Sequence, residues 1–132
     1  MSGEPEPGLR EIGQIAITVH DLERAAGFYR DVLGLRYLFS APPKMAFFDC
    51  GGIRLMLAVP EEERFDHPAS ILYYRVDDIH AAHRALQSRG AVFEREPGAI
   101  HKSDESELWM AFLRDSEDNL LALLSEVPRG KA

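Results

Sequence analysis

The apolar residues of the chain switch twice from a period of two to a helical period, first at residues 19–22 and again at residues 76–79. Before each switch, apolar or β-branched residues occupy alternate positions, which predicts a strand with one buried face. After it, apolar residues recur every three or four positions, which predicts an amphipathic helix. Each helix has an aspartate suited to cap its start and a glycine suited to close its end: Asp21 and Gly34, then Asp78 and Gly90. A strand–helix unit is therefore used twice.

The segments after the two helices also repeat. Residues 49–58 align without a gap to residues 115–124, and each begins with acidic, turn-forming residues and continues as an apolar run typical of a strand. The second unit is longer, and we place its extra residues in a loop around residues 100–108, which is either a lid or binding loop or a flexible acidic surface loop. The pattern predicts an α+β fold of two βαβββ modules. The expected strands are 12–19, 35–39, 45–49 and 53–59, then 70–76, 91–95, 108–114 and 119–125, and the expected helices are 22–33 and 79–89.

The segments outside these elements predict how the chain divides. Its first residues are rich in proline, glycine and glutamate and are expected to be disordered. The segment between the repeats is charged, bounded by proline and without periodicity, as is typical of a solvated linker. The predicted division is a tail (1–11), a first module (12–59), a linker (60–69), a second module (70–126) and a tail (127–132).

The composition of the chain limits the kinds of partner that the protein is expected to bind. The 132 residues suit one domain's worth of chain, and the single cysteine, Cys50, permits no internal disulfide. Together with the lack of a signal-peptide pattern, this predicts a cytoplasmic protein, and no apolar run is long enough to predict a membrane span. The net charge of −7 argues against nucleic acid, whose binding needs basic patches. We therefore expect a small-molecule partner.

Two segments resemble a known superfamily. QIAITVHDLERAAGFYRDVLGL (residues 14–35) is similar to the opening of a vicinal oxygen chelate module, of the glyoxalase / bleomycin resistance protein / extradiol dioxygenase superfamily. FLRDSEDNLLALLSE (residues 112–126) resembles its closing segment, with Ser116 and Asp118 in place of the usual proline and glycine. The resemblance covers residues 12–126. It implies two βαβββ modules that form paired half-barrels around a concave cleft, commonly in a homodimer.

In that superfamily a metal lies between the concave faces, bound by the first and last strands of each module. The matching positions here are Gln14, Met56, Ile71 and Ala122. Gln14 offers one amide oxygen and Met56 a soft thioether, whereas the other two offer no ligand. A catalytic metal generally takes three protein ligands. We therefore predict no metal and no other cofactor, and keep a divalent metal only as an alternative.

Strand alternation predicts which residues line the cavity. The side chains expected there are Gln14, Thr18, Arg54, Met56, Ile71, Tyr73, Arg75 and Ala122, with Trp109 as an aromatic wall, while the opposite positions should pack under the helices. Arg54 and Arg75 suggest an anionic ligand, because guanidinium forms paired hydrogen bonds with such groups. The alternative is that both arginines merely pair with nearby acids, among Asp49, Asp77 and Glu107.

Two main functions follow from this pattern. The first is a homodimeric member of the superfamily that binds a small, partly apolar molecule in its concave cavity without the usual metal, and binds neither nucleic acid nor membrane. The alternative is a glyoxalase-type lyase, isomerase or dioxygenase with a relocated metal or a metal-free acid–base site, for which Tyr73, His101 and Glu107 are the candidates. A partner-binding scaffold is the third reading. Whether the protein is an enzyme stays open at this point.

Overall fold

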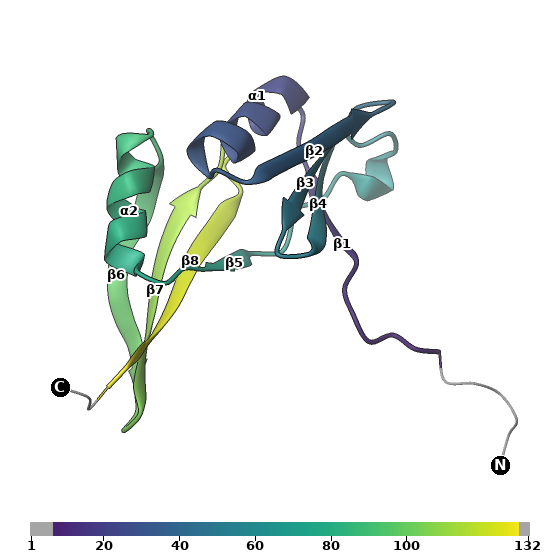
Figure 1. The fold of residues 1–132 in the computed structure, drawn as a ribbon. Helices are drawn as coiled ribbons and strands as arrows, with labels where there is room; N and C mark the ends of the chain where they lie inside the picture. The colour runs from purple at the N-terminus through teal and green to yellow at the C-terminus, as the bar shows by residue number, and fades with distance from the viewer. Residues whose placement is uncertain (1–6, 130–132) are drawn as a thin grey trace, which may run out of the picture.

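A computed structural model describes residues 7–129 and contains two four-stranded mixed sheets (Figure 1). The first sheet has the order β1-β4-β3-β2 and the second the order β5-β8-β7-β6. In each sheet the first pair is parallel and the other pairs are antiparallel. The α+β fold of two βαβββ modules is thereby confirmed. The strands are β1 (Gln14–Thr18), β2 (Arg36–Ala41), β3 (Met45–Cys50), β4 (Ile53–Ala58), β5 (Leu72–Arg75), β6 (Val92–Lys102), β7 (Ser106–Arg114) and β8 (Leu120–Pro128).

The helical segments begin at the predicted residues and end one residue earlier than predicted. α1 (Leu22–Gly27) continues as a π-helical turn (Phe28–Val32), and α2 (Ile79–Ser88) belongs to the second module. The carboxylates of Asp21 and Asp78 accept the backbone N–H groups of Arg24 and Ala81 at 3.1 and 3.0 Å. Beyond the helix ends, Gly34 and Gly90 have φ angles of +77° and +96°, which glycine adopts without steric cost. No helix of the described part of the chain is long and apolar enough to cross a membrane.

Each sheet buries one face beneath its helix, as the alternation predicts. Ile17, Leu55 and Leu57 are almost fully buried in the core under α1. Leu121 and Leu123 belong to the corresponding core under α2. Because neighbouring strand residues point to opposite faces, the residues between these positions lie on what we call the helix-free face of each sheet.

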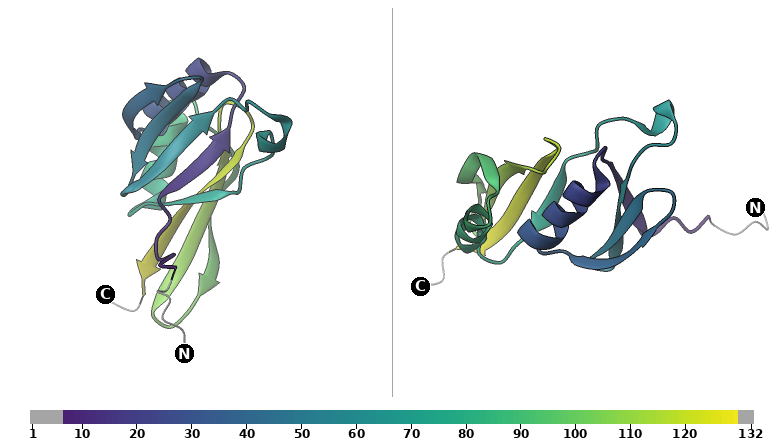
Figure 2. Two further views of the ribbon diagram at one scale, coloured as in Figure 1. Left: turned by 90° about the vertical axis from the view of Figure 1, so that its right-hand side faces the viewer. Right: turned by 90° about the horizontal axis from the view of Figure 1, so that it is seen from above.

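The prediction of a long loop around residues 100–108 is wrong. β6 runs to Lys102 and β7 begins at Ser106, so the extra residues form a long hairpin with a tight turn. With the end of β8, this hairpin makes a three-stranded arm that projects beyond the rest of the second module (Figures 1 and 2). Pro97, Gly98 and three register shifts along β6 interrupt its alternation, which is why the strand was not visible in the sequence.

Other boundaries differ by a few residues. β1 and β5 each begin two residues later than predicted, and β8 takes in residues 127 and 128 of the predicted C-terminal tail. Of the two predicted tails, residues 1–6 and 130–132 lie outside the described part of the chain.

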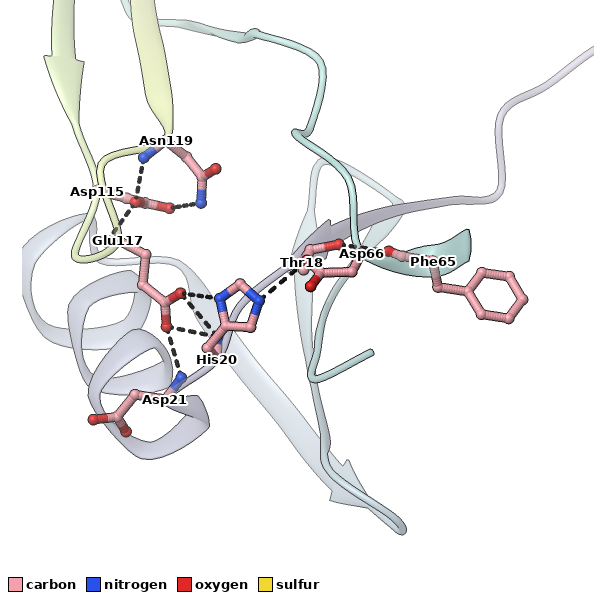
Figure 3. A network of polar contacts seen from close by, with 8 residues as sticks. All are labelled: Thr18, His20, Asp21, Phe65, Asp66, Asp115, Glu117 and Asn119. Atoms are coloured by element: carbon pink, nitrogen blue, oxygen red, sulfur yellow. Dashed lines mark hydrogen bonds and ion pairs between the residues drawn. The ribbon is translucent and has the colours of Figure 1, made fainter. Parts of the chain in front are cut away.

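The β7–β8 turn of the second module joins α1 of the first module. The hydroxyl group of Tyr29, a fully buried residue of the π-helical turn that follows α1, donates to the Asp115 carboxylate at 2.7 Å. Burial and this carboxylate raise the pKa of Tyr29 far above its ordinary value, so the phenol stays protonated and keeps donating. The Glu117 carboxylate accepts the backbone N–H groups of His20 and Asp21 at 2.8 and 2.7 Å (Figure 3). Carboxylates at this position suit the positive end of a helix dipole.

The turn itself is held by Asp115. One carboxylate oxygen accepts the backbone N–H groups of Glu117 and Asn119 at 2.8 and 2.9 Å, and the other accepts the Asn119 side-chain amide at 2.9 Å (Figure 3). Asp118 stands where the resemblance expects glycine and takes the left-handed backbone conformation with φ of 67°. Aspartate is among the few other residues that tolerate this conformation, so the departure from the usual sequence leaves the turn intact.

Candidate functional site

The helix-free face of the first module carries a cluster of polar and aromatic side chains. Arg54 Nε on β4 donates to Gln14 Oε1 on β1 at 3.0 Å. The same guanidinium lies 5.4 Å from the centre of the Phe47 ring, and Phe39 stacks on that ring at 4.6 Å. Gln14 Nε2 completes the group with a contact of 3.7 Å to the Met56 sulfur. We call these five residues the first cluster.

The second module presents a matching arrangement. The Tyr73 ring meets Phe112 edge-on at 6.0 Å, and the Arg95 guanidinium lies 5.6 Å from the centre of the Phe112 ring. Ala122 is opposite both Tyr73 and Phe112 in the sheet and is fully buried beneath them. These four residues form the second cluster.

The two clusters occupy equivalent places in their sheets. Phe47 on β3 is opposite Met56 on β4, and Phe112 on β7 is opposite Ala122 on β8. In each case an arginine lies over the aromatic ring, although it comes from β4 in one module and β6 in the other. A guanidinium held against a ring keeps most of its donors available, and the exposed aromatic edges offer apolar contact. This chemistry suits a small planar anion with an apolar body.

Three other predicted cavity residues are not free to bind a ligand through polar groups. Thr18 Oγ1 donates to the Phe65 carbonyl at 3.0 Å, which ties β1 to the linker. Arg75 is 3.6 Å from Glu126, so it forms a rim ion pair, with a different acid from those expected. Ile71 is 42% exposed and has no polar group to offer.

The assignment of Trp109 to the cavity wall is wrong. Its ring packs against the core under α2 and meets the His80 ring edge-on at 5.1 Å. Its indole N–H donates to Glu107 Oε1 at 3.0 Å. Phe112, three residues along β7, has the opposite parity and supplies the aromatic ring instead.

The clusters include four residues that the sequence analysis did not place there: Phe39, Phe47, Arg95 and Phe112. Their signal is the same alternation, applied to the middle strands rather than only to the first and last strand of each module. For Phe47 and Phe112 it was readable. For Arg95 it was hidden by the bulges of β6.

The three acid–base candidates are not assembled into one site. Tyr73 contacts Phe112 on β7. Glu107 precedes Phe112 by five residues on that strand, which separates the two by about 16 Å at the usual rise per residue. His101 is exposed on the arm, opposite Leu108. The geometry therefore offers no proton-transfer pair among them.

The residues at the four metal positions do not fit a metal ion. The Gln14 amide oxygen already accepts a hydrogen bond from Arg54, and a guanidinium beside it would repel a cation. Met56, Ile71 and Ala122 add one thioether and no nitrogen or oxygen ligand. Within residues 7–129, no group of three or more histidine, cysteine, aspartate or glutamate side chains is arranged to hold a metal.

Comparison with known proteins gives a consistent family. The model of the Glyoxalase/Bleomycin resistance protein/Dioxygenase superfamily matches residues 11–123. No curated protein matches the sequence.

Many solved structures share the fold. A superfamily member from Sphaerobacter thermophilus DSM 20745 matches with a TM-score of 0.73 and 19% identity, over 89% of this chain and 98% of that one. Lactoylglutathione lyase from Agrobacterium tumefaciens matches with a TM-score of 0.67 and 22% identity, over 91% and 96%. TioX from Micromonospora sp. ML1 matches with a TM-score of 0.70 and 19% identity, over 88% and 98%. With the family match over residues 11–123, the chain belongs to the Glyoxalase/Bleomycin resistance protein/Dioxygenase superfamily.

Proposed function

We propose that this protein binds a small aromatic or otherwise apolar carboxylate on the helix-free faces of its two modules, without the superfamily's usual metal. The observation that carries the proposal is the pair of arginine–aromatic clusters, centred on Phe47 and Phe112. They surround the strand positions where metal ligands would be expected and present cationic donors in their place. A mainly apolar surface with a few placed polar groups is typical of small-molecule sites.

We further propose that a second copy of the chain closes this site. Tyr73 and Phe39 are 45% and 44% exposed in the single chain, which leaves both clusters open to solvent. Exposed aromatic side chains gathered on one face are typical of a surface that is covered by a partner or a ligand. Sedimentation analysis should find a species of twice the 14.8 kDa chain mass, and a monomer at all concentrations would contradict this part of the proposal.

Calorimetric titration with phenylacetate tests the binding site. We expect saturable binding that weakens about tenfold in Arg54→Gln and in Arg95→Gln, because each variant removes a charge-assisted hydrogen bond to the ligand. Arg84→Gln, an exposed position on α2 outside both clusters, is the matched control and should bind as the unchanged protein does. The neutral analogue phenylacetamide should bind more weakly than phenylacetate. Equal affinity in all three variants would overturn the proposal.

Elemental mass spectrometry of protein purified without chelator tests the metal-free state. We expect far less than one equivalent of iron, nickel, zinc or manganese, and unchanged phenylacetate binding after chelator treatment. A near-stoichiometric metal that is lost in Gln14→Ala would contradict the proposal and restore a metal-dependent enzyme.

A further inference from the structure

A cavity opens between the two modules on the side of the sheets that carries the helices. Its volume is about 630 Å³. Leu72, Leu86, Leu113 and Leu121 line it from the second module, and Leu33 from the first. Leu121 and Leu113 point toward α2. Their strand neighbours Ala122 and Phe112 point to the opposite, helix-free face. The cavity therefore lies across the sheet from Phe112 and Ala122, and it meets the second cluster only at Tyr73, which also lines it.

Two arginines line this cavity, Arg75, which is paired with Glu126, and Arg89, which is held in place across the module boundary. Arg89 follows the last residue of α2, and its Nη1 donates to the Val32 carbonyl of the first module at 3.3 Å. The same Nη1 lies 3.3 Å from where a Cβ atom on Gly34 would stand, so the absence of a side chain there leaves room for the guanidinium. No carboxylate of residues 7–129 lies within 4.0 Å of Arg89. The cation is thus positioned across the module boundary with its charge unpaired.

We infer that this cavity binds an amphipathic monocarboxylate, such as a medium-chain fatty acid, with its apolar chain among the leucines and its carboxylate on Arg89. The volume is within the range of small-molecule sites, and the lining is mainly apolar. Of its two arginines, Arg75 is paired with Glu126, which leaves Arg89 as the anchoring charge. Guanidinium and carboxylate match in geometry and charge. The inference does not rest on the proposed function, because its anchoring cation is Arg89 rather than Arg54 or Arg95, and Tyr73 is the one cluster residue that also lines the cavity.

Calorimetric titration with octanoate and with 1-octanol tests this inference. The unchanged protein should bind octanoate more tightly than 1-octanol, because only the carboxylate pairs with Arg89. In Arg89→Gln we expect octanoate binding to weaken about tenfold and 1-octanol binding to stay the same. Arg84→Gln, on the same helix but outside the cavity, should change neither ligand. Octanoate binding that is the same in Arg89→Gln as in Arg84→Gln would overturn the assignment.

A second pair of variants tests the location. Ala85 is exposed and lines the cavity from α2, so Ala85→Trp should block it and abolish octanoate binding while the helix stays folded. Gln87→Trp introduces the same side chain on α2 outside the cavity and should bind normally. Octanoate binding that survives Ala85→Trp, or that is lost in Arg54→Gln, would place the fatty acid elsewhere. Self-association that is lost in Ala85→Trp would show that a second copy fills the cavity, and would also overturn the inference.

Discussion

At the scale of single residues, Tyr29, which is fully buried, and Tyr74, which is half-buried with a buried hydroxyl group, differ in one respect that matters for stability. Both line the space between sheet and helix, and burial raises the pKa of each phenol far above its ordinary value. The Tyr29 hydroxyl donates to Asp115 and joins the two modules, whereas the Tyr74 hydroxyl is buried with no partner among the described residues. A buried hydrogen bond stabilises the fold, and a buried hydroxyl without one costs free energy.

The two hydroxyl groups should therefore respond in opposite ways to removal. We expect Tyr29→Phe to lower the free energy of unfolding by about 1–3 kcal/mol, because Asp115 loses a buried donor. Tyr74→Phe should leave stability unchanged or raise it slightly. Urea denaturation followed by circular dichroism measures both. A Tyr74→Phe variant that is destabilised as much as Tyr29→Phe would contradict the assignment of these hydroxyl groups.

The contacts of His20 predict that the stability of the fold depends on pH. Its ring lies between Asp66 at 3.1 Å and Glu117 at 3.3 Å, and chiefly the hydrogen bond to Asp66 raises the pKa of the imidazole above its ordinary value of 6.5 (Figure 3). A raised folded-state pKa means that the folded chain binds the proton more tightly than the unfolded chain. The resulting stability is fully present below pH 6.5 and is lost as the pH rises through the folded value.

Proton NMR titration of the His20 ring measures this effect. We expect a pKa above 6.5 that falls toward that value in Asp66→Asn. Glu62→Gln removes a charge from the same linker without touching His20 and is the control. A His20 titration curve that is identical in Asp66→Asn and in the unchanged protein would contradict the role of Asp66.

At the scale of elements, the sequence predicted the strands and helices that have a regular alternation of apolar and polar residues. It missed the part of β6 where that alternation is interrupted. The strand–Asp–helix–Gly unit was readable because caps, helical spacing and strand spacing all agree. The arm was not, because Pro97 and Gly98 read as loop residues, while in the fold they lie at irregular positions of an edge strand. Trp109 was misassigned and Phe112 missed for a related reason: burial beneath α2 follows from strand parity, not from aromatic character.

The glycines that close the two helices provide the test at this scale. Gly34 and Gly90 both have left-handed backbones, so Gly34→Ala and Gly90→Ala should each lower the free energy of unfolding by about 1 kcal/mol. Gly34→Ala should cost more, because the new methyl group also presses on the Arg89 guanidinium. Gly13→Ala, where the backbone is not left-handed and a Cβ meets nothing, is the control. Thermal denaturation that ranks Gly13→Ala with the other two would show that these caps do not limit stability.

At the scale of the whole molecule, two modules with separate cores are joined by a few specific contacts. Phe28 and Leu33, at the end of the first helical segment, pack against both cores, and Asp115 and Glu117 bind the first module from the second. The sequence predicted the modules and their repeat, since each is encoded locally. The contacts between the modules could not be predicted from the sequence, because they depend on side chains that are brought together only by folding.

The central claim is that the helix-free faces bind a small carboxylate through the clusters around Phe47 and Phe112. The most direct measurement is a residue-resolved amide NMR titration of the protein with phenylacetate. We predict that the largest shift changes fall on β3 and β4 around Arg54 and on β7 and β8 around Phe112 and Ala122. Shift changes confined to other parts of the molecule, or no saturable change at all, would contradict this account.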